Sequence, residues 1–184
     1  MFVRGVTKED FMHLSQHGGF SESSEPKIPA KPPEEQSLPA GLMRHSIILR
    51  LKAKNLDEAI GELVPHALHG VGPIISRSQA ITKLIQKHLK SSKLDMRLGA
   101  AFVSSRIPQL PSARVALGIA PDGLWHASPN REPLHIVFLS LLPKDYTGQE
   151  IPPWARRCLH DNKKVYQIRT APDLEAVISI FNEA

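Results

Sequence analysis

The chain has a single cysteine, few aromatic side chains and no long apolar run. Cys158 stands alone, which excludes an internal disulfide and agrees with a reducing compartment. No apolar run approaches the roughly 20 residues that span a bilayer, and the N-terminus lacks the apolar core of a signal peptide. We therefore predict a cytoplasmic protein without membrane insertion.

Common motifs of metal and nucleotide sites are also missing. The sequence contains no Gly-x-x-x-x-Gly-Lys-Ser/Thr loop, no nucleophile elbow and no Cys-x-x-Cys. His66 and His69 are spaced to share one helical face, but no third ligand follows at zinc-like spacing. We interpret them as surface histidines and predict no metal and no cofactor.

The residues that are present divide the chain in two. Residues 1–45 contain five prolines, together with the polar run from Ser21 to Glu25. Proline removes backbone donors, and few large apolar side chains offset the entropy of ordering this stretch. We predict a flexible Pro/Ser/Glu-rich tail and linker over 1–45 and a folded domain over 46–184. The run Thr7–Asp10 resembles a helix start, which leaves open a frayed terminus or a short docking helix.

The basic charge lies in the predicted domain. Residues 46–184 carry 18 Lys and Arg against 12 Asp and Glu, a net charge of +6. Such a domain suits an acidic protein surface, phosphate groups or nucleic acid. The lysines at 83, 87, 90 and 93 could form a nucleic-acid face, but with aromatic residues at 5% the chain has few stacking platforms. Nucleic acid is therefore the disfavoured partner.

Strand and helix patterns alternate from Ser46 onward. The apolar patterns predict strands over 47–51, 100–103, 113–119, 134–142 and 165–168. They predict helices after Asn55 with a kink or a restart at Pro65, after a Ser76-x-x-Gln79 capping box, over 154–159 and over 174–181. Turns are expected at 122–123 and 128–130. Alternating elements of this kind predict an α/β fold in which helices cover a mixed β-sheet.

The most specific pattern is the segment Gly99–Pro108, which reads GAAFVSSRIP. It resembles the active-site segment of the fructose/mannitol/nitrogen-type EIIA (type 2) domains of the bacterial phosphoenolpyruvate-dependent sugar phosphotransferase system. In that family Gly-small-Ala-apolar-Pro-His ends on the histidine that carries a phosphoryl group. Aligning the glycines places Val103 on the proline and Ser104 on the histidine, or Ser105 after a slip of one residue.

The resemblance extends over most of 46–184. Lys54–Ile60 is similar to the family's first helix, and 118–123 to its strand-to-turn segment. The stretch 131–143 is similar to the Pro-Val-x-Leu-Val-Phe strand, and 169–175 falls where the last helix begins. The resemblance implies an EIIA-like fold, a mixed sheet covered by helices.

Family members also hold the phosphoryl oxygens with an arginine and a second histidine. Here Lys87 or His88 falls near the arginine position, and the later loop 144–153 contains no histidine. Arg106 falls on an arginine that commonly follows the acceptor. His135 lies in a predicted strand, where it either faces Ser104 or is a hydrogen-bonded structural histidine. We therefore name Lys87, His88, Arg106 and His135 as candidates for a pocket around Ser104.

Serine suits this relay poorly, because its hydroxyl is barely ionised at neutral pH and needs an adjacent base. The resemblance therefore predicts a regulatory or interaction protein of the phosphotransferase system that has lost phosphoryl relay. It implies protein partners such as phosphotransferase components, transporters or kinases. Two alternatives stay open: an active phosphocarrier with a non-standard acceptor such as His135 or His88, and a basic adaptor that binds nucleic acid. Phosphorylation of Ser104 or Ser105 itself would add negative charge beside Arg106.

Overall fold

The structure is a computed structural model that describes residues 38–91, 95–125 and 133–183. The predicted tail therefore falls outside the described residues as far as residue 37, and the predicted turn at 128–130 falls outside them entirely. The elements in the described part are β1 (Leu42–Ile48), α1 (Leu56–Ala67), η1 (Gly72–Arg77), α2 (Ser78–Ser91), β2 (Asp95–Arg97), β3 (Ala100–Ile107), β4 (Arg114–Leu124), β5 (Leu134–Pro143), α3 (Pro153–Leu159), α4 (Asn162–Thr170) and α5 (Leu174–Asn182).

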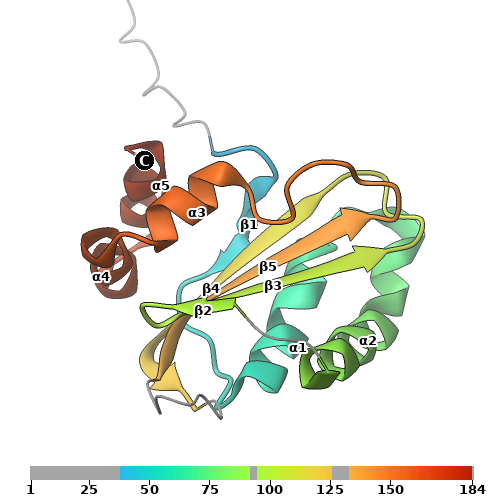
Figure 1. The fold of residues 1–184 in the computed structure, drawn as a ribbon, viewed down its shortest axis with the longest axis horizontal. Coiled ribbons are helices and arrows are strands. Elements are labelled where there is room, and N and C mark those ends of the chain that lie inside the picture. The colour runs from blue at the N-terminus through green and yellow to red at the C-terminus, as the bar shows by residue number, and fades with distance from the viewer. Residues whose placement is uncertain (1–37, 92–94, 126–132, 184) are drawn as a thin grey trace, which may run out of the picture. The chain divides into compact units, whose positions relative to one another are not determined.

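The strands form one mixed sheet in the order β1-β4-β5-β3-β2 (Figure 1). β1 pairs parallel with β4, and β3 pairs parallel with β5. The β4–β5 and β2–β3 pairs are antiparallel. The predicted fold class, a mixed sheet in an α/β domain, is confirmed.

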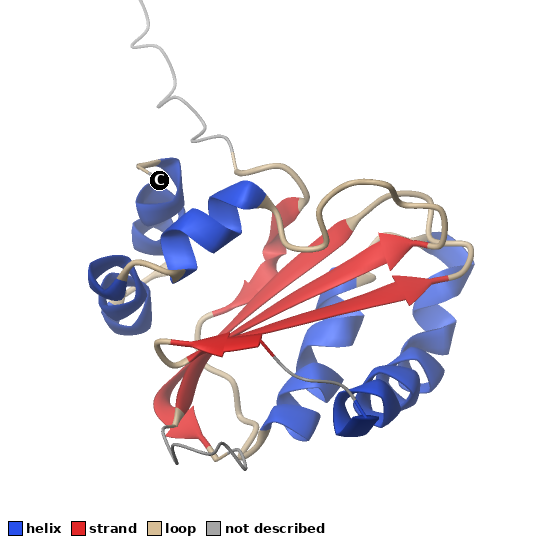
Figure 2. Ribbon diagram, viewed as in Figure 1, coloured by secondary structure: helices blue, strands red, loops and turns tan. Residues whose placement is uncertain are grey.

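Helices cover both faces of the sheet (Figure 2). One apolar cluster joins α1 and α2 to one face, and a second joins α3, α4 and α5 to the other. Successive residues of β5 alternate between the two clusters: Val137 and Leu139 belong to the first, Ile136 and Phe138 to the second. Because both faces are covered, the strand has a near-continuous apolar sequence rather than an alternating one.

Two helix starts form as the sequence predicts or implies. Asn55 caps α1, and its side-chain oxygen accepts a hydrogen bond from the Glu58 backbone N–H at 2.9 Å. Asp173 caps α5 in the same way, accepting from the Ala176 N–H at 2.9 Å. These caps satisfy backbone donors that lack partners inside the helix.

One prediction about helix boundaries was wrong, and one of the two alternatives at Pro65 is excluded. α1 does not restart at Pro65 but continues to Ala67, because burial of Val64 and Ala67 offsets the one helical hydrogen bond that proline cannot donate. Ser76 does not cap α2. It lies inside η1, where its hydroxyl donates to the Pro73 carbonyl at 2.7 Å, and α2 starts at Ser78.

The predicted strand over 165–168 is also wrong, because this stretch lies in α4. Val165 and Ile168 are buried three residues apart, while Tyr166 between them is 65% exposed. Positions i and i+3 share a helix face but lie on opposite faces of a strand. Asp161 caps the helix by accepting from the Lys163 N–H at 2.8 Å.

The bounds of β1 and β4 differ from the predicted ones. β1 runs over Leu42–Ile48 rather than 47–51, so it begins four residues ahead of the predicted domain boundary at 46. The predicted turn at 122–123 lies inside β4, where Gly123 has φ +82° and the pairing with β5 shifts register between Ile119 and Leu124. An irregularity of this kind lets a strand continue past a turn-forming sequence.

A tight turn positions the start of β3. Leu98 and Gly99 both have positive φ, 55° and 77°, and connect β2 to β3. Two-residue hairpins favour such angles, and glycine adopts them without strain. The turn sets Gly99 immediately before the strand that carries Ser104.

Candidate functional site

Ser104 and Arg106 project from the end of β3 on the face covered by α3–α5. Phe102, two residues earlier, belongs to the apolar cluster on that face, and strand residues two apart point the same way. Ser104 is paired with Ser140 of the neighbouring β5. Unlike Phe102, Ser104 and Arg106 are exposed, because the helices end before they reach this edge of the sheet.

The loop between β5 and α3 contacts these two exposed side chains. The Ser104 hydroxyl donates to a carboxylate oxygen of Glu150 at 2.9 Å. Arg106 donates to the backbone carbonyl oxygens of Lys144 at 3.0 Å and Tyr146 at 2.9 Å. Its guanidinium also lies 3.8 Å from Glu150, with both side chains about half exposed. Arg106 therefore holds the loop, and Glu150 occupies the space beside the serine.

Ser105 lies on the other side of β3. Its side chain points toward α1 and α2, as those of Val103 and Ile107 do. The residue is 7% exposed, and its hydroxyl has no hydrogen-bond partner within the described ranges. A slip of one residue would thus place the acceptor position in the core rather than at the surface.

The structure does not bring the other predicted pocket residues to Ser104. Lys87 and His88 are exposed near the end of α2, a helix that packs on the opposite face of the sheet. His135 alternates with Ile136 and so also points to that opposite face; its Nδ1 lies 3.1 Å from the Ala120 carbonyl oxygen. Of the four predicted pocket residues, only Arg106 lies beside Ser104: Glu150 accepts a hydrogen bond from Ser104 and forms an ion pair with Arg106 at 3.8 Å.

Glu150 was missed by the sequence reasoning. The loop 144–153 lacks histidine, and nothing in the spacing of Glu150 pairs it with a residue 46 positions earlier. Only the parallel pairing of β3 with β5 brings the loop to the end of β3. The one signal in the sequence is that the polar loop 144–153 follows the predicted strand 134–142, which could pair with the strand that carries Ser104.

No protein-family model and no curated protein matches the sequence. Solved structures do match. The nitrogen regulatory protein IIA-Ntr of Neisseria meningitidis superposes with a TM-score of 0.66 at 15% identity, covering 77% of this chain and 96% of that one. The chain has the EIIA type 2 fold. A crystal structure of IIA mannitol from Escherichia coli gives a TM-score of 0.62 at 15% identity over 76% of this chain and 98% of that one.

A third EIIA structure is a complex. Enzyme IIA mannitol of Escherichia coli, solved with phosphorylated enzyme IIB, superposes with a TM-score of 0.62 at 15% identity, covering 78% of this chain and 98% of that one. The EIIA fold predicted from Gly99–Pro108 and the accompanying segments is therefore confirmed. Among the described residues, no helix of this EIIA-fold chain is long and apolar enough to cross a membrane.

Three histidines of this chain, His45, His66 and His69, lie close together near the C-terminal end of α1. The rings of His45 and His69 lie 4.5 Å apart, and a ring nitrogen of His66 lies 2.8 Å from the His45 carbonyl oxygen. Partial burial, then the charges of His69, Arg114 and His66, lower the pKa of His45. The described residues contain no group of three His, Cys, Asp or Glu side chains arranged to hold a metal ion.

This cluster makes stability depend on pH. Because the pKa of His45 is lower in the folded state, the unfolded chain binds more protons once the pH falls below the ordinary histidine value of about 6.5. We expect the free energy of unfolding to fall between pH 7 and pH 5, by a small amount because His45 is exposed. Urea unfolding across that range should show that the free energy of unfolding depends less steeply on pH in His45→Gln than in the wild type. Equal slopes in His45→Gln and the wild type would contradict the assignment.

Cys158 is a core residue of α3. It is 0% exposed, and burial raises the pKa of its thiol to about 11, outweighing the nearby Lys164 charge. We expect the native protein to leave Ellman's reagent unreacted at pH 8, and the urea-unfolded protein to react with one thiol per chain. Rapid reaction of the native protein would show that the thiol is accessible.

Proposed function

We propose that this EIIA-fold domain is a regulatory protein of the bacterial phosphotransferase system that acts in the cytoplasm by contact with other proteins and does not relay phosphoryl groups. The observation that supports this most strongly is the Ser104–Glu150 hydrogen bond at 2.9 Å. The resemblance to EIIA type 2 domains aligns Ser104 with their phosphoryl-accepting histidine. In this chain that position carries a weak nucleophile, and the carboxylate that accepts its hydrogen bond places negative charge where a phosphoryl group would have to lie.

The charges around Ser104 oppose phosphoryl transfer. A phosphoryl group brings negative charge and needs cationic or N–H donors for its oxygens. Here Glu150 lies within hydrogen-bond distance of the hydroxyl that would be phosphorylated. Two like unit charges 4 Å apart repel by about 4 kcal/mol at an effective dielectric constant near 20. Arg106 offsets this only in part, because it already donates to two backbone carbonyls of the loop.

A carboxylate beside a hydroxyl can act as a general base and so help to phosphorylate it. The proposal therefore also depends on the next step, in which the phosphoryl group would have to leave Ser104 for another acceptor. Glu150 is about half exposed and forms an ion pair with Arg106 at 3.8 Å. A phosphoserine ester would not pass its phosphoryl group onward as a phosphohistidine does. A relay therefore lacks its donor step even if Ser104 were modified.

The same residues form an exposed surface that suits a protein partner. Ser104, Arg106 and the loop 144–153 lie together at one edge of the sheet, and loops held by a rigid scaffold commonly carry binding residues. The Escherichia coli IIA mannitol protein was solved bound to phosphorylated IIB, which supports a protein partner for this fold. The partner classes we expect are phosphotransferase components, transporters or kinases.

Affinity capture with matched variants tests the surface. We expect Ser104→Arg to lose the partners that the wild-type full chain captures from bacterial lysate, because a long side chain then covers the Ser104 surface. Ser76→Arg is the control: it makes the same change at an exposed serine of η1, on the α1–α2 side of the sheet. Loss in Ser104→Arg alone, with both variants folded by circular dichroism, supports the proposal. Capture of the same proteins by all three chains would rule this surface out.

A further inference from the structure

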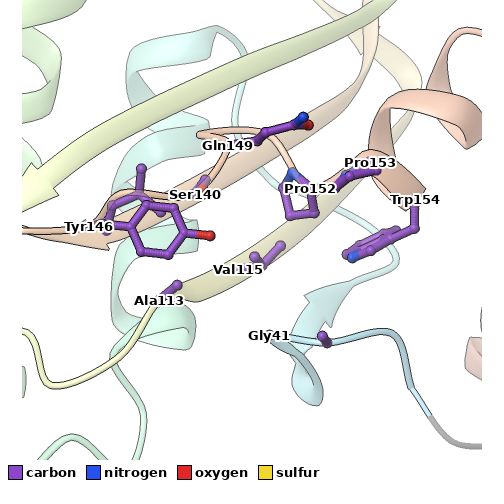
Figure 3. Close-up of a pocket in the computed structure, with 11 residues that line it drawn as sticks. Gly41, Ala113, Val115, Ser140, Tyr146, Gln149, Pro152, Pro153 and Trp154 are labelled. Carbon is purple, nitrogen blue, oxygen red and sulfur yellow. The ribbon is translucent and has the colours of Figure 1, made fainter.

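A cavity of about 510 Å³ lies next to the Ser104 surface, on the same side of the sheet (Figure 3). Its walls come from β4, β5, the loop before α3, and the residues that lead into β1. None of the side chains that line it carries a charge, and Val115, Leu142 and Pro152 make much of its wall apolar. A cavity of this size and character suits a small molecule. We call it the Trp154 cavity.

Two buried polar atoms in the Trp154 cavity lack partners. Ser140 is 1% exposed, and its hydroxyl has no hydrogen-bond partner in the part of the chain that the structure describes. Trp154 is partly buried, and its indole N–H is buried and likewise has no partner among the described residues. A buried donor without a partner costs free energy, so native proteins rarely keep one without a ligand or an ordered water. Both residues line the cavity.

The donors stand at separate ends of the cavity. Figure 3 shows Ser140 and the Tyr146 hydroxyl at one end and Trp154 at the other, with the Tyr146 hydroxyl directed inward. The three groups share one property, which is that each can donate a hydrogen bond, and the indole can only donate. A matching ligand therefore presents acceptors on two opposite edges.

Packing holds these donors in place. The Trp154 ring makes edge-to-face contacts with Phe138 and Phe181, at centroid distances of 5.6 and 5.2 Å. The Tyr146 backbone is held by Arg106, which donates to its carbonyl at 2.9 Å. Ser140 lies within β5, paired with β3 on one side and β4 on the other. A preformed site loses little entropy on binding, which favours affinity for a small ligand.

We propose that the Trp154 cavity binds a neutral, ring-shaped small molecule with hydrogen-bond acceptors on opposite edges, such as a cyclic amide. The apolar walls contact the faces of the ring, and the Ser140 hydroxyl and Trp154 N–H donate to its two acceptors. A charged ligand is excluded because no lining residue would compensate its lost hydration. Ser104 does not line the cavity, so the test of this ligand site is independent of the test of the proposed function.

The two tryptophans of the chain provide the assay. Trp125 is 77% exposed and does not line the cavity, so its indole N–H is an internal reference. We would titrate the full ¹⁵N-labelled chain with the diketopiperazine cyclo(Leu-Pro), which has a carbonyl on each of two opposite ring edges. Trp125→Phe assigns the two indole signals. We expect the Trp154 signal to shift in a saturable way and the Trp125 signal to stay in place.

Variants then test the donors. Ser140→Ala and Trp154→Phe each remove one donor, and we expect each to weaken binding by about three- to tenfold, the usual effect of one neutral hydrogen bond. Backbone amide shifts report binding where the indole is absent. Ser105→Ala is the matched control, since it removes another buried, unpartnered hydroxyl from the opposite face of β3. Unchanged affinity in Ser105→Ala supports the site. No saturable shift in the wild type, or full affinity in both donor variants, overturns it.

Discussion

Replacing Phe138 with alanine is expected to lower the free energy of unfolding by about 3–5 kcal/mol, the usual effect of truncating a buried phenylalanine. Phe138 is 0% exposed and lies in the central part of β5, paired with Phe102 of β3 and Leu117 of β4. Its ring also contacts Phe102 at 5.9 Å and Trp154 at 5.6 Å between centroids. The truncation leaves a cavity among rigid neighbours that cannot collapse into it.

Urea unfolding followed by circular dichroism measures this loss. A domain of this size has a total stability of about 5–15 kcal/mol, so Phe138→Ala should remove a large part of it. Phe138→Leu is the matched control, because it keeps an apolar side chain and should cost less than the alanine variant. A loss below about 1 kcal/mol in Phe138→Ala would mean that the α3–α5 layer does not pack on the sheet as described.

On the opposite face, Leu63→Ala is expected to cost about 2–5 kcal/mol. Leu63 is 0% exposed and belongs to the cluster that joins α1 and α2 to the sheet. Leu84→Ala makes the same change on α2 at a residue that is 38% exposed, and should cost much less. Equal losses in the two variants, measured by urea unfolding, would show that α1 is not buried against the sheet.

The sequence predicted the parts of the fold that depend on local patterns. The apolar run over 134–142 predicted a strand, and β5 runs over Leu134–Pro143. Asn55 with Glu58 predicted the start of α1, and the apolar face over 174–181 predicted α5. Each of these signals lies within a few residues of the structure it specifies.

The strand predicted over 165–168 was wrong because so short a segment is compatible with either a strand or a helix. The sequence from Val165 to Ile168 has two β-branched residues around two polar ones, a pattern compatible with a strand or with one helical turn. This segment is helical because Asp161 caps its start and because Val165 and Ile168 are buried together in the second cluster. Neither contact can be read from the four residues alone.

The candidate site was predicted only in part. Ser104 and Arg106 come from one strand two residues apart, so their proximity follows from the strand period. The resemblance to a family suggested Lys87 and His88, and a predicted strand suggested His135, but the structure places all three on the face opposite Ser104. Glu150 and the Trp154 cavity depend on pairing between distant strands, which local patterns do not encode.

The central claim, that this EIIA-fold chain does not accept phosphoryl groups, is tested most directly by intact mass. The purified full chain would be incubated with phosphoenolpyruvate and the two general phosphotransferase proteins, then weighed under mildly alkaline conditions that preserve phosphohistidine. An EIIA domain that retains its histidine would be the positive control in the same mixture. We predict an unchanged mass for this chain. A gain of one phosphoryl group would contradict the account, and its loss in His88→Ala or His135→Ala would identify the acceptor.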